Sequence, residues 1–119
     1  DYRSMITLTL KTSEGESITA GALFGRRDPR IVRINQFTVD VIPEGHLLML
    51  YNHDKPGVIG NIGTAIGSAN INIARMHWSR LQAEQKAMVV FSTDTPVDAQ
   101  LLKKLKETPN VISVQELDM

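Results

Sequence analysis

His46–Asn70 reads HLLMLYNHDKPGVIGNIGTAIGSAN, and this stretch decides the fold. Its first seven residues form a nearly continuous apolar run, as expected for a buried central strand. Four apolar or small residues then recur at the spacing of one helix face, namely Ile59, Ile62, Gly63 and Ile66. This pattern predicts a helix over residues 56–69, with Asp54 as its N-cap and Pro56 in its first turn. The stretch therefore encodes a strand, a polar loop and a helix.

The residues after this helix continue the alternation of strands and helices. Ile71–Leu81 is expected to be a strand, with its odd-numbered residues on one face and its even-numbered residues on the other. The polar residues 82–85 are then a hairpin loop, and the apolar residues 87–91 form the next strand. Four apolar residues make the inward stripe of a second helix, namely Val97, Leu101, Leu102 and Leu105. A proline–asparagine pair ends that helix, and residues 111–117 alternate as a last strand.

The order of elements from residue 46 onward is therefore β, α, β, β, α, β. This order predicts a ferredoxin-like α+β module, in which both helices cover one face of an antiparallel sheet. Right-handed crossovers and the central hairpin leave few other topologies. Many unrelated functions share this fold, so the fold by itself identifies none of them.

The first forty residues are expected to form strands without a helix. Met5–Leu10 and Ser17–Phe24 alternate around a glycine-containing turn, which predicts a hairpin. A second turn is expected at residues 25–29. Residues 31–34 and 37–41 then follow as two short strands. The segment is therefore predicted to be a β-rich partial domain that precedes the α+β module.

Pro43-Glu44-Gly45 is the predicted boundary between the two parts, because proline and glycine together interrupt a strand pattern. We therefore assign one domain to residues 1–44 and the other to residues 45–119. The chain begins with Asp1 and opens directly into a strand pattern. We interpret it as a piece of a longer protein.

The composition of the 119 residues excludes several classes of protein. The formal net charge is zero, which argues against a nucleic-acid-binding surface. The chain has no cysteine, so disulfides, thiolate metal sites and cysteine nucleophiles are excluded. No apolar run approaches the roughly 20 residues that span a bilayer. We therefore expect a cytoplasmic protein that binds neither nucleic acid nor membrane.

No catalytic or metal-binding set is recognisable. The histidines are His46, His53 and His77, and none has the spacing of a metal-binding pair. The glycines of the predicted helix and its approach are Gly57, Gly60, Gly63 and Gly67, and they match neither phosphate-binding fingerprint. Each glycine inside a helix costs roughly 0.5–1 kcal/mol relative to alanine. We therefore expect that they allow close packing against the sheet, although the close approach of a second helix or a ligand would also require them.

A polar constellation around the predicted helix start suits a free amino acid. It comprises Asn52, Asp54, the run Pro56–Ile59 and Asn72. The N-terminus of a helix offers backbone N–H groups to a carboxylate. Asparagine and aspartate oxygens accept hydrogen bonds from an ammonium group, and Gly57 lets a ligand approach the backbone. Spacing alone supports equally well a second interpretation, in which Asp54 only caps the helix and Asn72 only ends a turn.

Two motifs in this region resemble the signature of ACT domains. Asp54–Gly60 reads DKPGVIG and Ala69–Ala74 reads ANINIA, which are similar to the D-x-P-G-V and N-I-A motifs of that family. The resemblance covers residues 46–117. Upstream, residues 21–25 (GALFG) and 29–35 (PRIVRIN) are similar to the segment that precedes the ACT domain in the long-form D-3-phosphoglycerate dehydrogenase family.

That resemblance implies a regulatory fragment without catalytic residues or a cofactor of its own. Enzymes of this family oxidise 3-phosphoglycerate with NAD in serine synthesis, and L-serine inhibits them by binding between two ACT domains. Residues 1–44 would then end an allosteric substrate-binding domain. Four arginines of that segment are candidates for its anion site, namely Arg26, Arg27, Arg30 and Arg33. The implied partners are the amino-acid effector, a second copy of the chain and the missing catalytic domain.

The resemblance also implies which residues bind the effector. Asn52 and Asp54 would contact it from one subunit and Asn72 from the other. The backbone around Gly57 would line the same site. The full set of expected effector-binding residues is Asn52, Asp54, Pro56, Gly57, Val58, Ile59, Asn72 and Ile73.

Two other interpretations of the sequence stay open. The β part of iron–sulfur L-serine dehydratase resembles the same two-domain arrangement and also carries an ACT module. An ACT module without a ligand would serve dimerisation alone, because an exposed sheet edge invites pairing with another chain.

Overall fold

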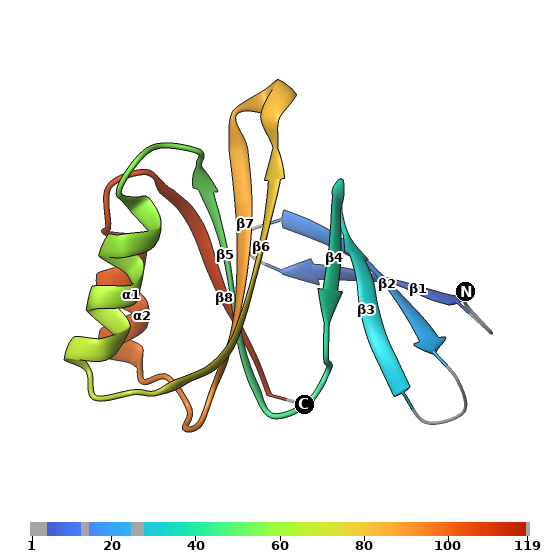
Figure 1. Cartoon of the computed structure of the whole chain (residues 1–119), viewed down its shortest axis with the longest axis horizontal. Coiled ribbons are helices and arrows are strands. Elements are labelled where there is room, and N and C mark those ends of the chain that lie inside the picture. Colours follow the sequence, from blue (N-terminus) through green and yellow to red (C-terminus); the bar gives the residue numbers. More distant parts are fainter. Residues whose placement is uncertain (1–4, 13–14, 25–27, 119) are drawn as a thin grey trace. The chain divides into compact units, whose positions relative to one another are not determined.

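The computed structural model describes residues 5–12, 15–24 and 28–118, and it describes side chains from Arg30 onward. The chain divides into two compact units, residues 1–43 and residues 44–119. The first unit consists of strands, whereas the second contains both helices and four further strands (Figure 1). In the described part of the chain, no helix is both long and apolar enough to cross a membrane.

The first unit is an antiparallel sheet of four strands in sequential order. The strands are β1 (Met5–Thr12), β2 (Gly15–Phe24), β3 (Asp28–Ile34) and β4 (Phe37–Val41). The predicted hairpin of β1 and β2 is present. The two short strands expected at residues 31–34 and 37–41 form a second hairpin, which turns at Asn35, whose φ of 52° lies in the left-handed region that asparagine tolerates. The turn was predicted at residues 25–29, but Asp28 and Pro29 already belong to β3. Residues 25–27 of that turn lie outside the described part of the chain.

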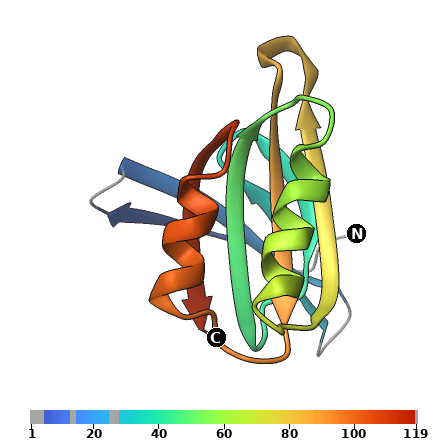
Figure 2. The same ribbon diagram turned by 90° about the vertical axis from the view of Figure 1, so that its left-hand side faces the viewer.

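The second unit has the predicted βαββαβ order. Its elements are β5 (His46–His53), α1 (Val58–Ser68), β6 (Ile73–Leu81), β7 (Lys86–Thr93), α2 (Ala99–Lys106) and β8 (Val111–Asp118). The antiparallel sheet has the order β6-β7-β5-β8, and both helices lie on one face of it (Figure 2). The predicted ferredoxin-like fold is therefore confirmed.

The core of this unit lies between the two helices and the sheet. β5 is a central strand, so its apolar run is flanked on both sides by β7 and β8. Leu48 and Leu50 of β5 contribute to the core together with Ile62 of α1 and Leu105 of α2. Because side chains alternate along a strand, the even-numbered residues at the end of β5 face the helices. Asn52 is the last of them.

The start of α1 differs from the prediction. The helix begins at Val58 rather than at residue 56, and Gly57 is its N-cap, with a φ of 86° and no capping side chain. Asp54 does not cap the helix, because its carboxylate is bonded elsewhere. The chain must turn sharply between β5 and α1, and glycine adopts the required left-handed backbone without strain. The start of α2 is capped by a side chain instead, since Asp98 accepts a hydrogen bond from the Leu101 amide at 2.8 Å.

The predicted face pattern of β6 is wrong at its first residues. The register with β7 shifts between Ile73 and Arg75. As a result Ile73 lies opposite Thr93 and Met76 lies opposite Phe91, both on the face that the helices cover. The even-numbered residues from Met76 onward therefore face the helix side, together with Ile73.

The helix glycines do not serve the expected close packing against the sheet. A Cβ atom built on Gly60, Gly63 or Gly67 meets no atom of the described chain within 4 Å. This stripe of α1 is open, so packing within the second unit does not require these glycines.

Candidate functional site

Asn52 is a buried polar residue at the carboxyl end of β5. Only 2% of its surface is exposed, and its Oδ1 has no hydrogen-bond partner among the described residues. Its Nδ2 donates to the backbone oxygen of His53 at 2.9 Å. An unpartnered acceptor in a buried position costs about 1–3 kcal/mol. Such an acceptor is therefore unusual, and an ordered water, an ion or a bound ligand would satisfy it.

Asp54 lies in the loop between β5 and α1 and is bonded to the β6–β7 hairpin. Its Oδ2 accepts a hydrogen bond from Nε of Arg80 at 2.8 Å. Its backbone amide donates to the backbone oxygen of Gln85 at 2.9 Å. These two bonds hold the loop beside the hairpin and place a carboxylate next to the end of β5.

Arg80 is the residue of this site that the sequence pattern did not single out. Arg80 pairs with Ala87 of β7, and Ala87 pairs with Asn52 of β5. The three residues therefore form one cross-strand row on the helix-covered face, with the smallest side chain in the middle. The guanidinium carbon of Arg80 also lies 5.4 Å from the centre of the Trp78 ring, within the range of a cation–π contact.

The first turn of α1 follows directly after this loop. Its first helical hydrogen bond runs from the Asn61 amide to the oxygen of Gly57. The amides of Val58 and Ile59 precede that bond, so they have no partner within the helix. Pro56 and Gly57 are exposed, whereas Val58 is buried and Ile59 is half-buried. The helix therefore presents N–H groups at the same end of the sheet as Asn52 and Asp54.

Asn72 and Ile73 lie at the opposite end of the sheet. Ile73 pairs with Thr93, which in turn is level with His46 at the start of β5. Asn72 Nδ2 donates to Asp94 Oδ2 at 2.8 Å, and the Asp94 amide donates to the Asn72 backbone oxygen. The length of β6, roughly 25 Å, thus separates them from Asp54. Within one chain, Asn52, Asp54 and residues 56–59 therefore lie at one end of the sheet, whereas Asn72 and Ile73 lie at the other.

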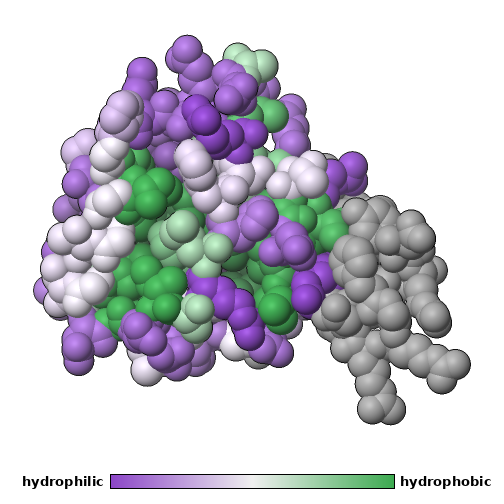
Figure 3. Space-filling view, in the orientation of Figure 1, coloured by the Kyte–Doolittle hydropathy of each residue, from purple (hydrophilic) through white to green (hydrophobic). Residues whose placement is uncertain are grey.

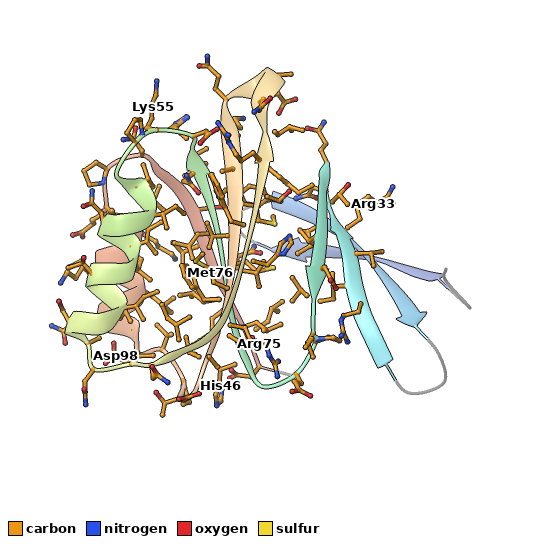
Figure 4. The ribbon with its side chains drawn as sticks, viewed as in Figure 1. Arg33, His46, Lys55, Arg75, Met76 and Asp98 are labelled. Atoms are coloured by element: carbon orange, nitrogen blue, oxygen red, sulfur yellow. The ribbon has the colours of Figure 1, made fainter. Side chains whose placement is uncertain are left out.

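The edge of the sheet at β6 is apolar and open. β6 is the outermost strand, and no strand of the described chain pairs with its outer side. Met76 and Trp78 are 51% and 44% exposed, which is high for large apolar side chains. Figure 3 shows apolar groups gathered between α1 and the β6 edge, and Figure 4 labels Met76 on the helix side of the sheet.

The histidines noted in the sequence belong to no metal site in the described part of the chain. Among the described residues, no three histidine, aspartate or glutamate side chains are grouped to hold a metal ion. His46 is hydrogen-bonded to Asp118 at 2.8 Å, and His53 is exposed.

The four arginines considered for an anion site belong to the first unit. Arg26 and Arg27 lie outside the described residues. Arg30 pairs with Asp40 at 3.3 Å, and Arg33 is exposed. An anion site in this segment therefore stays a prediction.

Comparison with known families agrees with this fold. The family model described as "ACT domain" matches residues 46–110. This match covers more than half of the chain, from the start of β5 to the turn before β8. The chain belongs to the ACT domain family.

Several relatives share one name, D-3-phosphoglycerate dehydrogenase. The protein from Bacillus subtilis (strain 168) is 37% identical over 76% of this chain, which is 17% of the relative. That from Synechocystis sp. (strain PCC 6803) is 32% identical over 93% of this chain and 20% of the relative. That from Archaeoglobus fulgidus is 29% identical over 99% of this chain and 23% of the relative. The chain therefore spans about a fifth of the length of the relatives that it matches.

Proposed function

We propose that this chain is a regulatory segment of a phosphoglycerate dehydrogenase and that it binds a small amino acid such as L-serine. The observation that carries the proposal is the buried Oδ1 of Asn52, which has no partner within the described part of the chain. The ammonium group of an amino acid carries three donors. One of them would satisfy Asn52, and another would bond the carboxylate of Asp54.

The carboxylate of the amino acid requires donors at the same end of the sheet. The amides of the first turn of α1 lie there, and the helix dipole favours an anion at this position. Gly57, which is exposed, keeps side-chain atoms away from those amides. A zwitterion therefore meets acceptors on β5 and the following loop, and donors on α1.

We also propose that two copies of the chain complete the site by pairing their β6 strands. A two-fold axis makes such a pairing antiparallel, so the start of one β6 lies level with the end of the other. Asn72 of a second copy would then approach Arg80 and Asp54 of the first. The exposed Met76 and Trp78 and the open glycine stripe of α1 are surfaces that such a contact would cover.

The catalytic part of the parent enzyme is proposed to lie outside this chain. The parent would bind NAD and oxidise 3-phosphoglycerate, whereas the described residues would bind effector and assemble. Effector bound at the contact between copies would favour one arrangement of the parent over another. Coupling of this kind is typically worth about 1–3 kcal/mol.

Calorimetric titration of the chain with L-serine and glycine tests this function, with sedimentation velocity run on the same samples. We expect saturable heat in a dimer, and loss of heat in Asn52→Leu with the dimer retained. The exposed β6 edge also suits a module that only dimerises. A dimer that binds neither amino acid would establish that second function and refute the first.

A further inference from the structure

Arg80 and Asp54 form an ion pair that crosses the candidate site. Arg80 Nε lies 2.8 Å from Asp54 Oδ2, and the side chains of Arg80 and Asp54 are 45% and 16% exposed. Because β7 lies between β6 and β5, the Arg80 side chain must cross β7 to reach Asp54. The residue of β7 in the Arg80 row is Ala87, whose methyl group leaves room for this crossing. The ion pair therefore spans the strip of sheet beside Asn52.

We propose that Arg80 changes partner when effector binds. In the free chain its guanidinium is hydrogen-bonded to the carboxylate of Asp54. The effector's ammonium group replaces it there, and the freed guanidinium then binds the effector's carboxylate together with the amides of α1. This inference rests on the proposed function and names the ligand class, which is a small molecule with an ammonium group and a carboxylate on the same carbon atom.

The hydrogen bonds of the free chain favour this exchange. Arg80 bonds Asp54, yet Asn52 Oδ1 stays without a donor. An ammonium group has enough donors for both oxygens, so replacing the guanidinium by an ammonium satisfies an acceptor that is otherwise unpaired. The ion pair is open to solvent on its Arg80 side, so it is a weak interaction that a ligand is able to displace.

The position of Trp78 keeps the displaced guanidinium near the site. The Arg80 guanidinium already lies 5.4 Å from the centre of the Trp78 ring. Trp78 and Arg80 are two residues apart on β6, so both point to the same face of the sheet. The planar guanidinium offers two parallel N–H groups to a carboxylate, which an ammonium group of lysine does not.

Titration of the 119-residue chain with L-serine, glycine and ethanolamine tests the exchange. Ethanolamine has the ammonium group but no carboxylate, so it should displace Arg80 without giving it a new partner. We expect wild type to bind L-serine and glycine more tightly than ethanolamine. Arg80→Gln should weaken binding of both amino acids by roughly 10- to 100-fold, the loss expected for a charged hydrogen bond. Binding of ethanolamine should be retained or strengthened, since the carboxylate of Asp54 is no longer paired with a guanidinium.

Two further variants separate this inference from general effects. Lys86→Gln removes a neighbouring positive charge from β7 and should bind all three compounds as wild type does. Arg80→Lys keeps the charge without the planar group and should lose part of the amino-acid affinity. Unchanged or tighter binding of L-serine by either folded Arg80 variant would overturn the exchange and leave the proposed function standing. Absence of amino-acid binding in wild type would overturn both.

Discussion

Asn52 follows Leu50 in the row of β5 side chains that faces the helices, but the row ends with an amide oxygen to which no described residue is bonded. Leu50 is fully buried in the core, and Asn52 is 2% exposed. The strand therefore continues an apolar row into a polar position whose oxygen the described residues leave without a donor.

Replacing this amide by an apolar side chain should separate stability from binding. Asn52→Leu removes the unpartnered acceptor, which costs about 1–3 kcal/mol, and loses one ordinary bond to His53 worth about 1 kcal/mol. We expect the free energy of unfolding in urea to equal or exceed that of wild type, while the heat of L-serine binding disappears. A loss of stability above about 2 kcal/mol would show that Oδ1 has a partner in solution.

The glycines at the start of α1 should respond to alanine with opposite signs. Gly57 has a φ of 86°, where a Cβ atom is strained by about 1–2 kcal/mol. Gly60 has a helical backbone with open space around it, so Gly60→Ala should stabilise the chain by roughly 0.5–1 kcal/mol. Urea unfolding at low protein concentration measures both values. A destabilised Gly60→Ala variant would indicate that another surface covers this face of the helix.

The cap of α2 should contribute measurably to stability. Asp98 accepts a hydrogen bond from the Leu101 amide at 2.8 Å, so Asp98→Ala should reduce the free energy of unfolding by about 1 kcal/mol. Asp98→Asn keeps a capping oxygen and serves as the control. Equal losses in the two variants would mean that the charge of Asp98 matters rather than its cap.

The β6 edge should determine self-association. Met76→Glu places a charge on the outer strand at an exposed apolar position and should shift sedimentation toward the monomer. Ile112→Glu changes a similarly exposed apolar residue on β8, the other edge strand, and should leave the oligomeric state unchanged. If only the β8 variant dissociated the assembly, the proposed pairing through β6 would be wrong.

The elements of the second unit could be predicted from sequence because their signals are local. The apolar run of β5 and the helical spacing of Ile62 and Ile66 depend only on neighbouring residues. The start of α1 could not be placed in this way. Its position depends on the positive φ of Gly57, and the carboxylate of Asp54 is held by a residue 26 positions away.

The candidate site was predicted only in part for the same reason. Arg80 enters the site through the register of β6 with β7 and through the position of β5 in the sheet. Counting outward from the hairpin loop places Arg80 opposite Ala87, so part of the signal was present in the sequence. The sequence carried no signal for the shift in register between Ile73 and Arg75, because no local pattern marks such a shift. Whether the expected residues bind an amino acid stays a prediction.

The position of β5 in the sheet also determines how late its hydrogen-bonded partners are synthesised. β5 is synthesised first, yet both of its hydrogen-bonded neighbours, β7 and β8, are synthesised after β6. During translation, β5 therefore leaves the ribosome well before the strands that pair with it. Its native pairing with β8 begins only when Val111 has emerged. Contacts of such long sequence separation slow folding. The apolar strand β5 therefore lacks its second hydrogen-bonded neighbour until β8, the last strand, has been made.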